Sequence, residues 1–181
     1  EQNSIMHASS MLRVATIIGE NLNRTRRDIA EQCRDLNQQA SASMIVAGQR
    51  KGGDMRLFLI YPEGNFIEAT PDTPYFQIGE SKYGKPIIDR VVKRHTTLDE
   101  AAKLALISMD STIRSNLSVG LPLDLAIIKT DALAISSHVN IDAKNEYFAM
   151  IRNRWSEALG HAFAELPDAD LVDKGDEFQA Q

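Results

Sequence analysis

Two stripes of apolar residues at helical spacing open the chain, and a polar stretch separates them. The first stripe follows Ser9 and Ser10, either of which suits a helix N-cap, and the second follows Arg27. The stripes consist of Met11, Val14, Ala15, Ile18 and Leu22, and then of Ile29, Cys33 and Leu36. Because residues 23–27 are all polar, the pattern predicts two helices.

Short apolar runs separated by turn residues come next, which is typical of a strand meander. The predicted strands cover residues 44–48, 57–61, 66–69 and 75–78. Gly52 and Gly53 lie between the first two runs, as expected for a hairpin, and residues 62–65 form the next turn.

Helical spacing returns in the second half of the chain. Residues 86–92 predict a short helix with Pro86 in its first turn, where the missing N–H is tolerated. Thr97 and Glu100 form a capping box at the start of a longer helix that runs to about Arg114. Its predicted buried face consists of Leu98, Ala102, Ala105, Met109 and Ile113.

A strand pair, a helix and an acidic tail end the chain. Residues 123–128 and 134–139 are predicted to pair, and a helix follows from about Lys144. That helix presents Phe148, Ile151, Trp155, Leu159 and Phe163. Residues 168–181 are poor in apolar side chains, so we expect a disordered tail after a single domain of residues 1–167. This order of elements predicts an α+β fold in which helices cover both faces of two stacked sheets.

Composition and charge argue against several classes of protein. The net charge is −5, and the basic residues form no continuous stripe, so we expect no nucleic-acid partner. No apolar run approaches the roughly 20 residues that span a bilayer, so we expect no membrane partner. Cys33 is the only cysteine, which excludes an internal disulfide and predicts a cytoplasmic location.

The common motifs of nucleotide-binding, metal and nucleophile sites are missing from the sequence. It contains no G-x-G-x-x-G, no Walker A and no G-x-S-x-G pattern. The histidines lie far apart without carboxylates at ligand spacing, so we expect neither a metal site nor a cofactor. They are His7, His95, His138 and His161. Cys33 lies on the apolar face of a predicted helix, where a structural role is favoured over a nucleophilic one.

Two segments rich in serine and glycine remain. The junction 114–120 follows the long helix and precedes an apolar strand, and the turn 79–84 leads into the short helix. Small hydroxylated residues at a helix end bring N–H groups and side-chain oxygens to one point, where a ligand can use them. The alternative is local capping, in which the serines satisfy free backbone groups and the lysines are solvated.

Four stretches of the sequence resemble one protein family. They cover residues 60–74, 77–86, 110–125 and 154–159. These stretches are similar to Anbu, a family of bacterial proteasome-type proteases related to proteasome β subunits and HslV. The resemblance implies an N-terminal-nucleophile hydrolase with a four-layer αββα sandwich, here lacking its first strands.

The family mechanism uses a threonine at the mature N-terminus, whose own amine activates its hydroxyl, with a lysine and an aspartate nearby. These groups belong to the first strands of the family fold. We expect about four of those strands, and the nucleophile, to lie elsewhere in the molecule, since their absence would leave sheet edges unpaired. An internal threonine such as Thr25, Thr70 or Thr97 has no free amine and cannot replace the nucleophile.

The residues that surround the nucleophile in the family do have counterparts in this chain. In proteasome subunits the turn after the second central helix reads Asp-x-x-Ser-Gly-Gly. Ser118 matches its serine and Gly120 its second glycine, while Ser115 replaces the aspartate. The resemblance therefore implies that Ser118 and Ser115 support the nucleophile and that Asn116 and Gly120 flank it. The neutral Ser115 cannot stabilise an ammonium as a carboxylate does, which argues against ordinary proteasome activity.

The turn from Gly79 to Lys82 matches the Gly-Ser-Gly-Ser turn that flanks the threonine in the family. Either Ser81 or Lys82 falls at its serine, since the register is ambiguous by one residue. We expect Gly79, Ser81 and Lys82 to lie behind the nucleophile or beside the substrate.

Three functions are compatible with the resemblance. The favoured one is a threonine peptidase subunit that hydrolyses peptides or proteins inside a self-compartmentalising homo-oligomer, either a ring or an open helical assembly. The alternatives are a non-catalytic scaffold with the same assembly, and an amidase or peptide ligase that uses the same nucleophile. The outer faces of the helices at 81–92 and 97–114 are candidate assembly surfaces, or simply solvated faces, and no ATPase partner can be read from the sequence.

Overall fold

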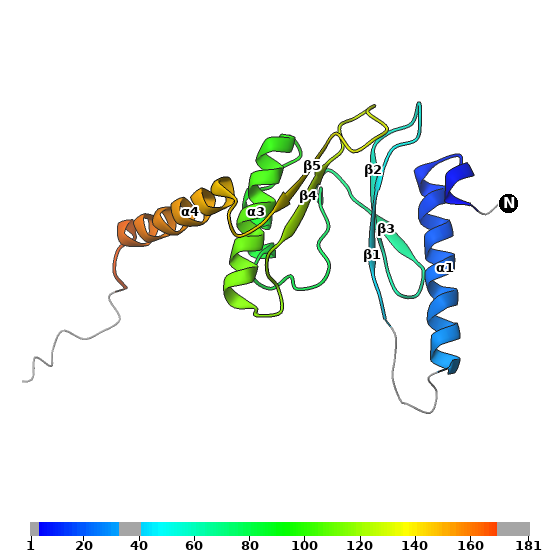
Figure 1. Cartoon of the computed structure of the whole chain (residues 1–181), viewed down its shortest axis with the longest axis horizontal. Coiled ribbons are helices and arrows are strands. Elements are labelled where there is room, and N and C mark those ends of the chain that lie inside the picture. Colours follow the sequence, from blue (N-terminus) through cyan, green and yellow to red (C-terminus); the bar gives the residue numbers. More distant parts are fainter. Residues whose placement is uncertain (1–3, 33–40, 170–181) are drawn as a thin grey trace, which may run out of the picture.

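Four layers follow one another across the molecule (Figure 1): α1, the sheet β1-β2-β3, the pair β4-β5, and α3 with α2 beside it. The computed structural model describes residues 4–32 and 41–169. Its elements are the 3-10 helix η1 (Ile5–His7), α1 (Met11–Gln32), β1 (Met44–Gly48), β2 (Arg56–Ile60), β3 (Phe66–Glu68), α2 (Lys85–Val91), α3 (Leu98–Ser115), β4 (Leu123–Ile127), β5 (Ser137–Ile141) and α4 (Glu146–Glu165). Both sheets are antiparallel, and the predicted α+β sandwich is confirmed.

Helix α1 packs on one face of the three-stranded sheet. The core between them consists of Met11, Val14, Ala15, Phe58 and Ile60. Phe58 and Ile60 are fully buried, because alternate residues of β2 point to the same face. The rings of Phe58 and Phe66 pack edge to face, with 5.6 Å between their centroids. The helix approaches the turn before β3 so closely that a Cβ on Gly19 would lie 2.1 Å from the Gly64 carbonyl oxygen.

Helix α3 is covered on several sides by β4-β5, α2 and α4. The apolar core here consists of Leu106, Ile141, Phe148 and Ile151. Three polar side chains of α3 are buried as well, namely Ser108, Asp110 and Thr112. Asp110 forms ion pairs with Arg114 of α3, at 3.1 Å, and with Arg152 of α4, at 2.8 Å. The buried carboxylate therefore joins α4 to α3.

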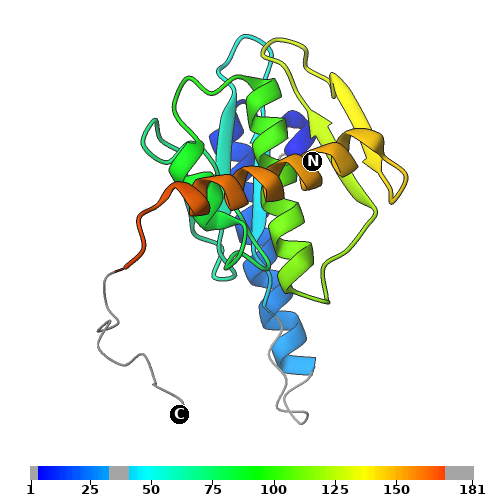
Figure 2. The same ribbon diagram turned by 90° about the vertical axis from the view of Figure 1, so that its left-hand side faces the viewer.

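Helix α4 starts against α3 and then projects away from the other elements (Figure 1), and it crosses in front of α3 in the view of Figure 2. Asn145 caps its N-terminus by accepting the Phe148 N–H at 2.9 Å. Leu159 and Phe163 are 52% and 80% exposed, so the apolar stripe predicted for this helix is buried only over its first half.

The prediction of two leading helices is wrong, because α1 runs without a break through the polar stretch 23–27. That stretch contains no glycine or proline, so nothing in it opposes helical backbone geometry, and its side chains only change which faces are solvated. Cys33, Leu36 and most of the predicted tail lie outside the described residues.

The predicted strand at 75–78 is also wrong. The Tyr75 hydroxyl donates to the Asp89 carboxylate of α2 at 2.5 Å. The Lys85 ammonium donates to the Tyr75 hydroxyl and to the Asp89 carboxylate, so these side chains hold the segment against α2. Instead of a strand, the segment is irregular.

Two further predictions need correction in the second half. The last strand begins at Ser137 and not at 134, because the preceding loop adopts positive φ at Asp131 and Leu133 and is held to Gln49. On α3, Leu98 is 49% exposed, whereas Leu104 and Leu106 are buried. The helix contacts several elements, so a single-face pattern does not describe it.

Candidate active site

The structure brings the two serine-glycine segments together at the C-terminal end of α3. Glu80, in the turn before α2, accepts a hydrogen bond from the side-chain amide of Asn116 at 2.9 Å. Asn116 is the C-cap residue of α3. The turn 79–84 and the junction 114–120 therefore form one site, although Glu80 and Asn116 lie 36 residues apart in the sequence.

Asn116 also organises the junction itself. Its side-chain oxygen accepts the backbone N–H of Ser118 at 2.9 Å and the Ser118 hydroxyl at 2.7 Å. Because the O–H of Ser118 donates its hydrogen bond to Asn116, the lone pairs of the Ser118 oxygen are left to accept a hydrogen bond from another group. Ser118 is exposed, so such a group can reach it.

Glu80 completes the connection from the turn side. One of its oxygens accepts the Lys82 backbone N–H at 2.9 Å, while the other accepts from Asn116. The Lys82 N–H is the main cause that lowers the pKa of the Glu80 carboxyl below its ordinary value, with partial burial opposing it and Asn116 reinforcing it. The carboxylate therefore holds the turn and the junction in one arrangement.

Glu80 is the functional candidate that the sequence reasoning missed. The available signal was a carboxylate inside a turn bracketed by Gly79 and Gly84. Gly84 has a structural role, because a Cβ at this position would lie 2.1 Å from the Ser108 hydroxyl oxygen and 2.9 Å from the Ser108 carbonyl oxygen. The glycine thus lets the start of α2 lie directly against α3, which places Glu80 within reach of Asn116.

The other predicted site residues lie around this connection. Ser115 is the last residue of α3 and is exposed, and Gly120 is exposed with open space around it. Gly79 has a φ of +79°, which glycine adopts without strain. The Ser81 carbonyl accepts the first N–H of α2, which is a local capping role, and Lys82 is exposed. The roles of these residues in chemistry stay predictions.

Two of the threonines that cannot act as nucleophiles have structural partners. Thr97 forms the predicted capping box with Glu100 at the start of α3, and that prediction is confirmed. Thr70 pairs with Thr73 in an isolated bridge. Both contacts explain these threonines without any role in catalysis.

Within residues 4–32 and 41–169, no group of three or more His, Cys, Asp and Glu side chains could hold a metal ion. One histidine does lie beside a carboxylate, because pairing of β4 with β5 places His138 at 3.2 Å from Asp124. No helix in these ranges has the length and apolar character needed to cross a bilayer.

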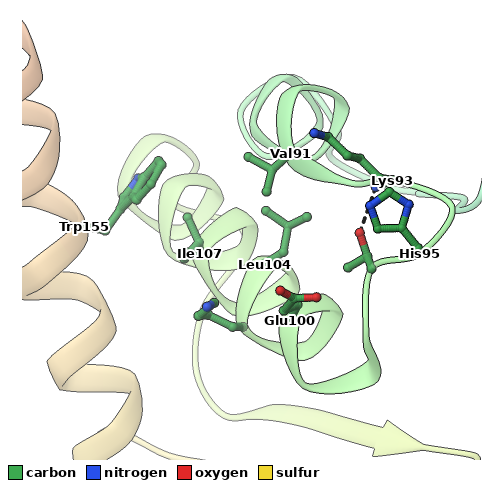
Figure 3. A pocket seen from close by; sticks show the side chains of 9 residues that line it. Val91, Lys93, His95, Glu100, Leu104, Ile107 and Trp155 are labelled. Carbon is green, nitrogen blue, oxygen red and sulfur yellow. Dashed lines mark hydrogen bonds between the residues drawn. The ribbon is translucent and has the colours of Figure 1, made fainter.

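A separate cavity of about 440 Å³ lies between α2, α3 and α4 (Figure 3). Its apolar walls come from Val91, Leu104, Ile107 and Trp155. None of residues 79–82 or 115–120 lines it. We call it the α2–α3 groove.

The sequence and the structure are similar to known proteasome subunits. A family model described as proteasome subunit matches residues 22–128. Anbu from Hyphomicrobium sp. strain MC1 is 46% identical with a TM-score of 0.81, over 93% of this chain and 68% of that one. Anbu from Yersinia bercovieri, described as an ancestral β-subunit, is 50% identical with a TM-score of 0.83, over 92% of this chain and 68% of that one.

A third solved structure is a helical assembly of the Anbu complex from Pseudomonas aeruginosa. It is 44% identical with a TM-score of 0.82, over 90% of this chain and 67% of that one. This chain therefore spans about two thirds of the length of these relatives. No curated protein matches it. Because the family match extends over residues 22–128 and these relatives share at least 44% identity over nine tenths of the sequence, the chain belongs to the Anbu family of proteasome-type subunits.

Proposed function

We propose that this chain belongs to a cytoplasmic, proteasome-like threonine peptidase that hydrolyses peptide bonds inside a self-compartmentalising homo-oligomer. The observation that carries the proposal is the hydrogen-bonded connection from Glu80 through Asn116 to Ser118. It joins the two segments that flank the nucleophile in the family. The helical assembly of the Pseudomonas aeruginosa relative supports an oligomer of a similar kind.

In this proposal Ser118 supports the N-terminal threonine that the family uses as its nucleophile, a residue that corresponds to none of residues 1–181. The Ser118 oxygen can accept a hydrogen bond from the amine of that threonine, because the O–H of Ser118 already donates to Asn116. The amine takes the proton of the threonine hydroxyl as the oxygen attacks the peptide carbonyl carbon. The C–N bond of the peptide then breaks, and the leaving amine takes the proton from the ammonium group of the threonine. Water finally hydrolyses the acyl-enzyme.

Ser115 favours one alternative, a non-catalytic scaffold. Proteasome subunits carry an aspartate at the matching position, and a neutral hydroxyl does not stabilise an ammonium as a carboxylate does. If no carboxylate stabilises the protonated amine of the threonine, the subunit still assembles but does not turn over substrate.

Labelling of the fully processed, full-length protein with a β-lactone separates these functions. We expect a covalent adduct on the N-terminal threonine. Ser118→Ala should slow labelling about twofold to thirteenfold, the effect of one neutral hydrogen bond of about 0.5–1.5 kcal/mol. The control, Ser156→Ala, alters an exposed serine of α4 and should leave the rate unchanged.

Ser115→Asp should raise the labelling rate if the missing charge limits activity. No adduct on the processed wild-type protein would favour the scaffold. An adduct without cleavage of any peptide would indicate the amidase or peptide ligase.

A further inference from the structure

The carboxylate of Glu80 has a different partner on each of its two oxygens. One oxygen accepts the backbone N–H of Lys82, and the other accepts the side-chain amide of Asn116, both at 2.9 Å. Glu80 lies in the turn before α2, whereas Asn116 is the C-cap of α3. The second bond therefore joins two elements, and its donor is a side chain that also contacts the junction.

The charge of Glu80 determines which end of the Asn116 amide faces it. The backbone N–H of Lys82 is the main cause that lowers the pKa of the Glu80 carboxyl, so this group is ionised at neutral pH. An ionised carboxylate has no proton to donate and only accepts hydrogen bonds. The amide nitrogen of Asn116 must therefore point to Glu80, which leaves the amide oxygen for the junction.

The orientation of the Asn116 amide in turn determines how Ser118 is used. The amide oxygen accepts the Ser118 hydroxyl at 2.7 Å and the Ser118 backbone N–H at 2.9 Å. If the amide were reversed, its nitrogen would donate to the Ser118 oxygen and occupy a lone pair. It would also face the Ser118 N–H, which is itself a donor. Glu80 thus favours the arrangement in which the Ser118 oxygen is free to accept.

Hydrogen bonds in such a chain also strengthen one another. A carboxylate that accepts from an amide N–H polarises the amide, so the amide oxygen becomes a stronger acceptor for the Ser118 hydroxyl. A hydroxyl that donates more strongly is in turn a better acceptor. The effect of the Glu80 charge is thereby transmitted to the Ser118 oxygen. This effect matters because Ser115, at the position of the aspartate in proteasome subunits, is neutral.

A local turn explains only part of this arrangement. An asparagine side chain that accepts the N–H two residues later is a common turn, and the Asn116 carbonyl also accepts the Val119 N–H at 3.1 Å. Neither contact requires anything of residue 80. The bond from Asn116 to Glu80 is additional, and it directs the amide from outside the turn.

We propose that Glu80 is a positioning residue that acts through Asn116 to make the Ser118 oxygen an acceptor for the amine of the N-terminal threonine. In this way Glu80 takes over part of the electrostatic role of the aspartate that Ser115 replaces. The role in the reaction rests on the proposed function, whereas the orientation of Asn116 and Ser118 can be measured without any reaction.

Hydrogen exchange at the Ser118 amide of the full-length protein tests the orientation. Ser118 is exposed, so its N–H is protected by its bond to Asn116. Glu80→Gln offers one acceptor oxygen to two donors, so exchange should become about twofold to thirteenfold faster, the effect of one hydrogen bond. The matched control is Glu63→Gln, because Glu63 is an exposed glutamate of another turn and should leave the rate unchanged. Equal rates in Glu80→Gln and the wild-type protein would overturn the inference in favour of a local turn.

The double variant Glu80→Gln, Asn116→Asp exchanges donor and acceptor along the connection. The introduced glutamine donates its N–H to the introduced carboxylate and keeps an oxygen for the Lys82 N–H. The carboxylate accepts both the N–H and the hydroxyl of Ser118, so exchange at Ser118 should return to the wild-type rate. Exchange as fast as in Glu80→Gln alone would contradict the direction of these hydrogen bonds.

Labelling with a β-lactone measures the consequence for the reaction. Glu80→Gln should slow labelling by about twofold or more, but by no more than Ser118→Ala does, because Glu80 acts only through Ser118. In the Ser118→Ala background, Glu80→Gln should have no further effect, and a double-mutant cycle measures this coupling. Additive losses would indicate general distortion of the site and would overturn the positioning role.

The inference and the proposed function fail in different ways. If the processed wild-type protein forms no adduct, the peptidase is wrong, while hydrogen exchange at Ser118 still decides whether Glu80 orients this residue. If the wild-type protein is labelled and Glu80→Gln reacts as fast, the peptidase stands and the positioning role is wrong.

Discussion

The two halves of the sandwich are stabilised in different ways. Between α1 and the sheet β1-β2-β3, every side chain of the buried cluster is apolar. Around α3, by contrast, Asp110 is buried with Arg114 and Arg152 as partners, and the Thr112 hydroxyl donates to the Ser108 carbonyl at 2.9 Å. Apolar contacts tolerate many arrangements, whereas buried polar groups require specific partners. The candidate active site lies in the half where such pairs decide the geometry.

The largest expected effect tests the apolar half. Phe58→Ala removes a fully buried ring that packs against Phe66, so the free energy of unfolding should fall by about 3–5 kcal/mol in urea denaturation. Leu12→Ala is the control, because Leu12 is 45% exposed and should cost about 1 kcal/mol. Similar losses for both variants would contradict an apolar core centred on Phe58.

Each half of the sandwich has one glycine, Gly19 or Gly84, at which an added Cβ would clash with a neighbouring element. Gly19→Ala and Gly84→Ala should each lower stability by about 1–3 kcal/mol, since each new Cβ would lie 2.1 Å from an oxygen atom. At Gly84 that atom is the Ser108 hydroxyl oxygen, so Ser108→Ala should rescue Gly84→Ala in part. At Gly19 it is the backbone oxygen of Gly64, for which no side-chain change can compensate. Thermal unfolding of the single and double variants provides the measurement.

The buried carboxylate tests the polar half. Asp110→Asn removes the charge that pairs with Arg114 and Arg152, and it should lower the free energy of unfolding by about 1–3 kcal/mol. The exposed Asp72→Asn should change it by no more than about 0.5 kcal/mol. If Asp110→Asn behaved like the control, the ion pairs would not hold α4 to α3.

The smallest effect concerns the pH dependence of the candidate site. The pKa of Glu80 is lowered in the folded protein, so its connection to Asn116 is fully present above the ordinary glutamate value of about 4.3. The connection is lost as the pH falls through the lower, folded-state pKa. NMR shifts of the Lys82 and Ser118 amides should report this titration, and Glu80→Gln should abolish it. A midpoint above the ordinary glutamate value would contradict the assignment.

Much of the fold could be predicted because local patterns dominate it. The β1-β2 hairpin, α2, α3 with its capping box and the start of α4 all follow from apolar spacing and turn or cap residues. The errors arose where a long-range contact replaced the local rule, as with Tyr75 bound to Asp89 and the loop at Asp131 bound to Gln49. Sequence separation hides such contacts.

The candidate site shows the same limit. The sequence and its family resemblance single out Ser118, Ser115 and the turn from Gly79 to Lys82, but they do not identify Glu80 as the residue that joins them. The carboxylate meets Asn116 only because Gly84 lets the start of α2 lie against α3. No spacing rule relates residues 80 and 116.

The sequence by itself determined most of the helices and strands and the family, because these depend on local periodicity and on matching motifs. Only the tertiary structure decided how the two serine-glycine segments meet, which polar groups α3 buries, and that α4 extends beyond its contact with α3. These features depend on packing between elements far apart in the chain, where the geometry of each contact is set by all the others.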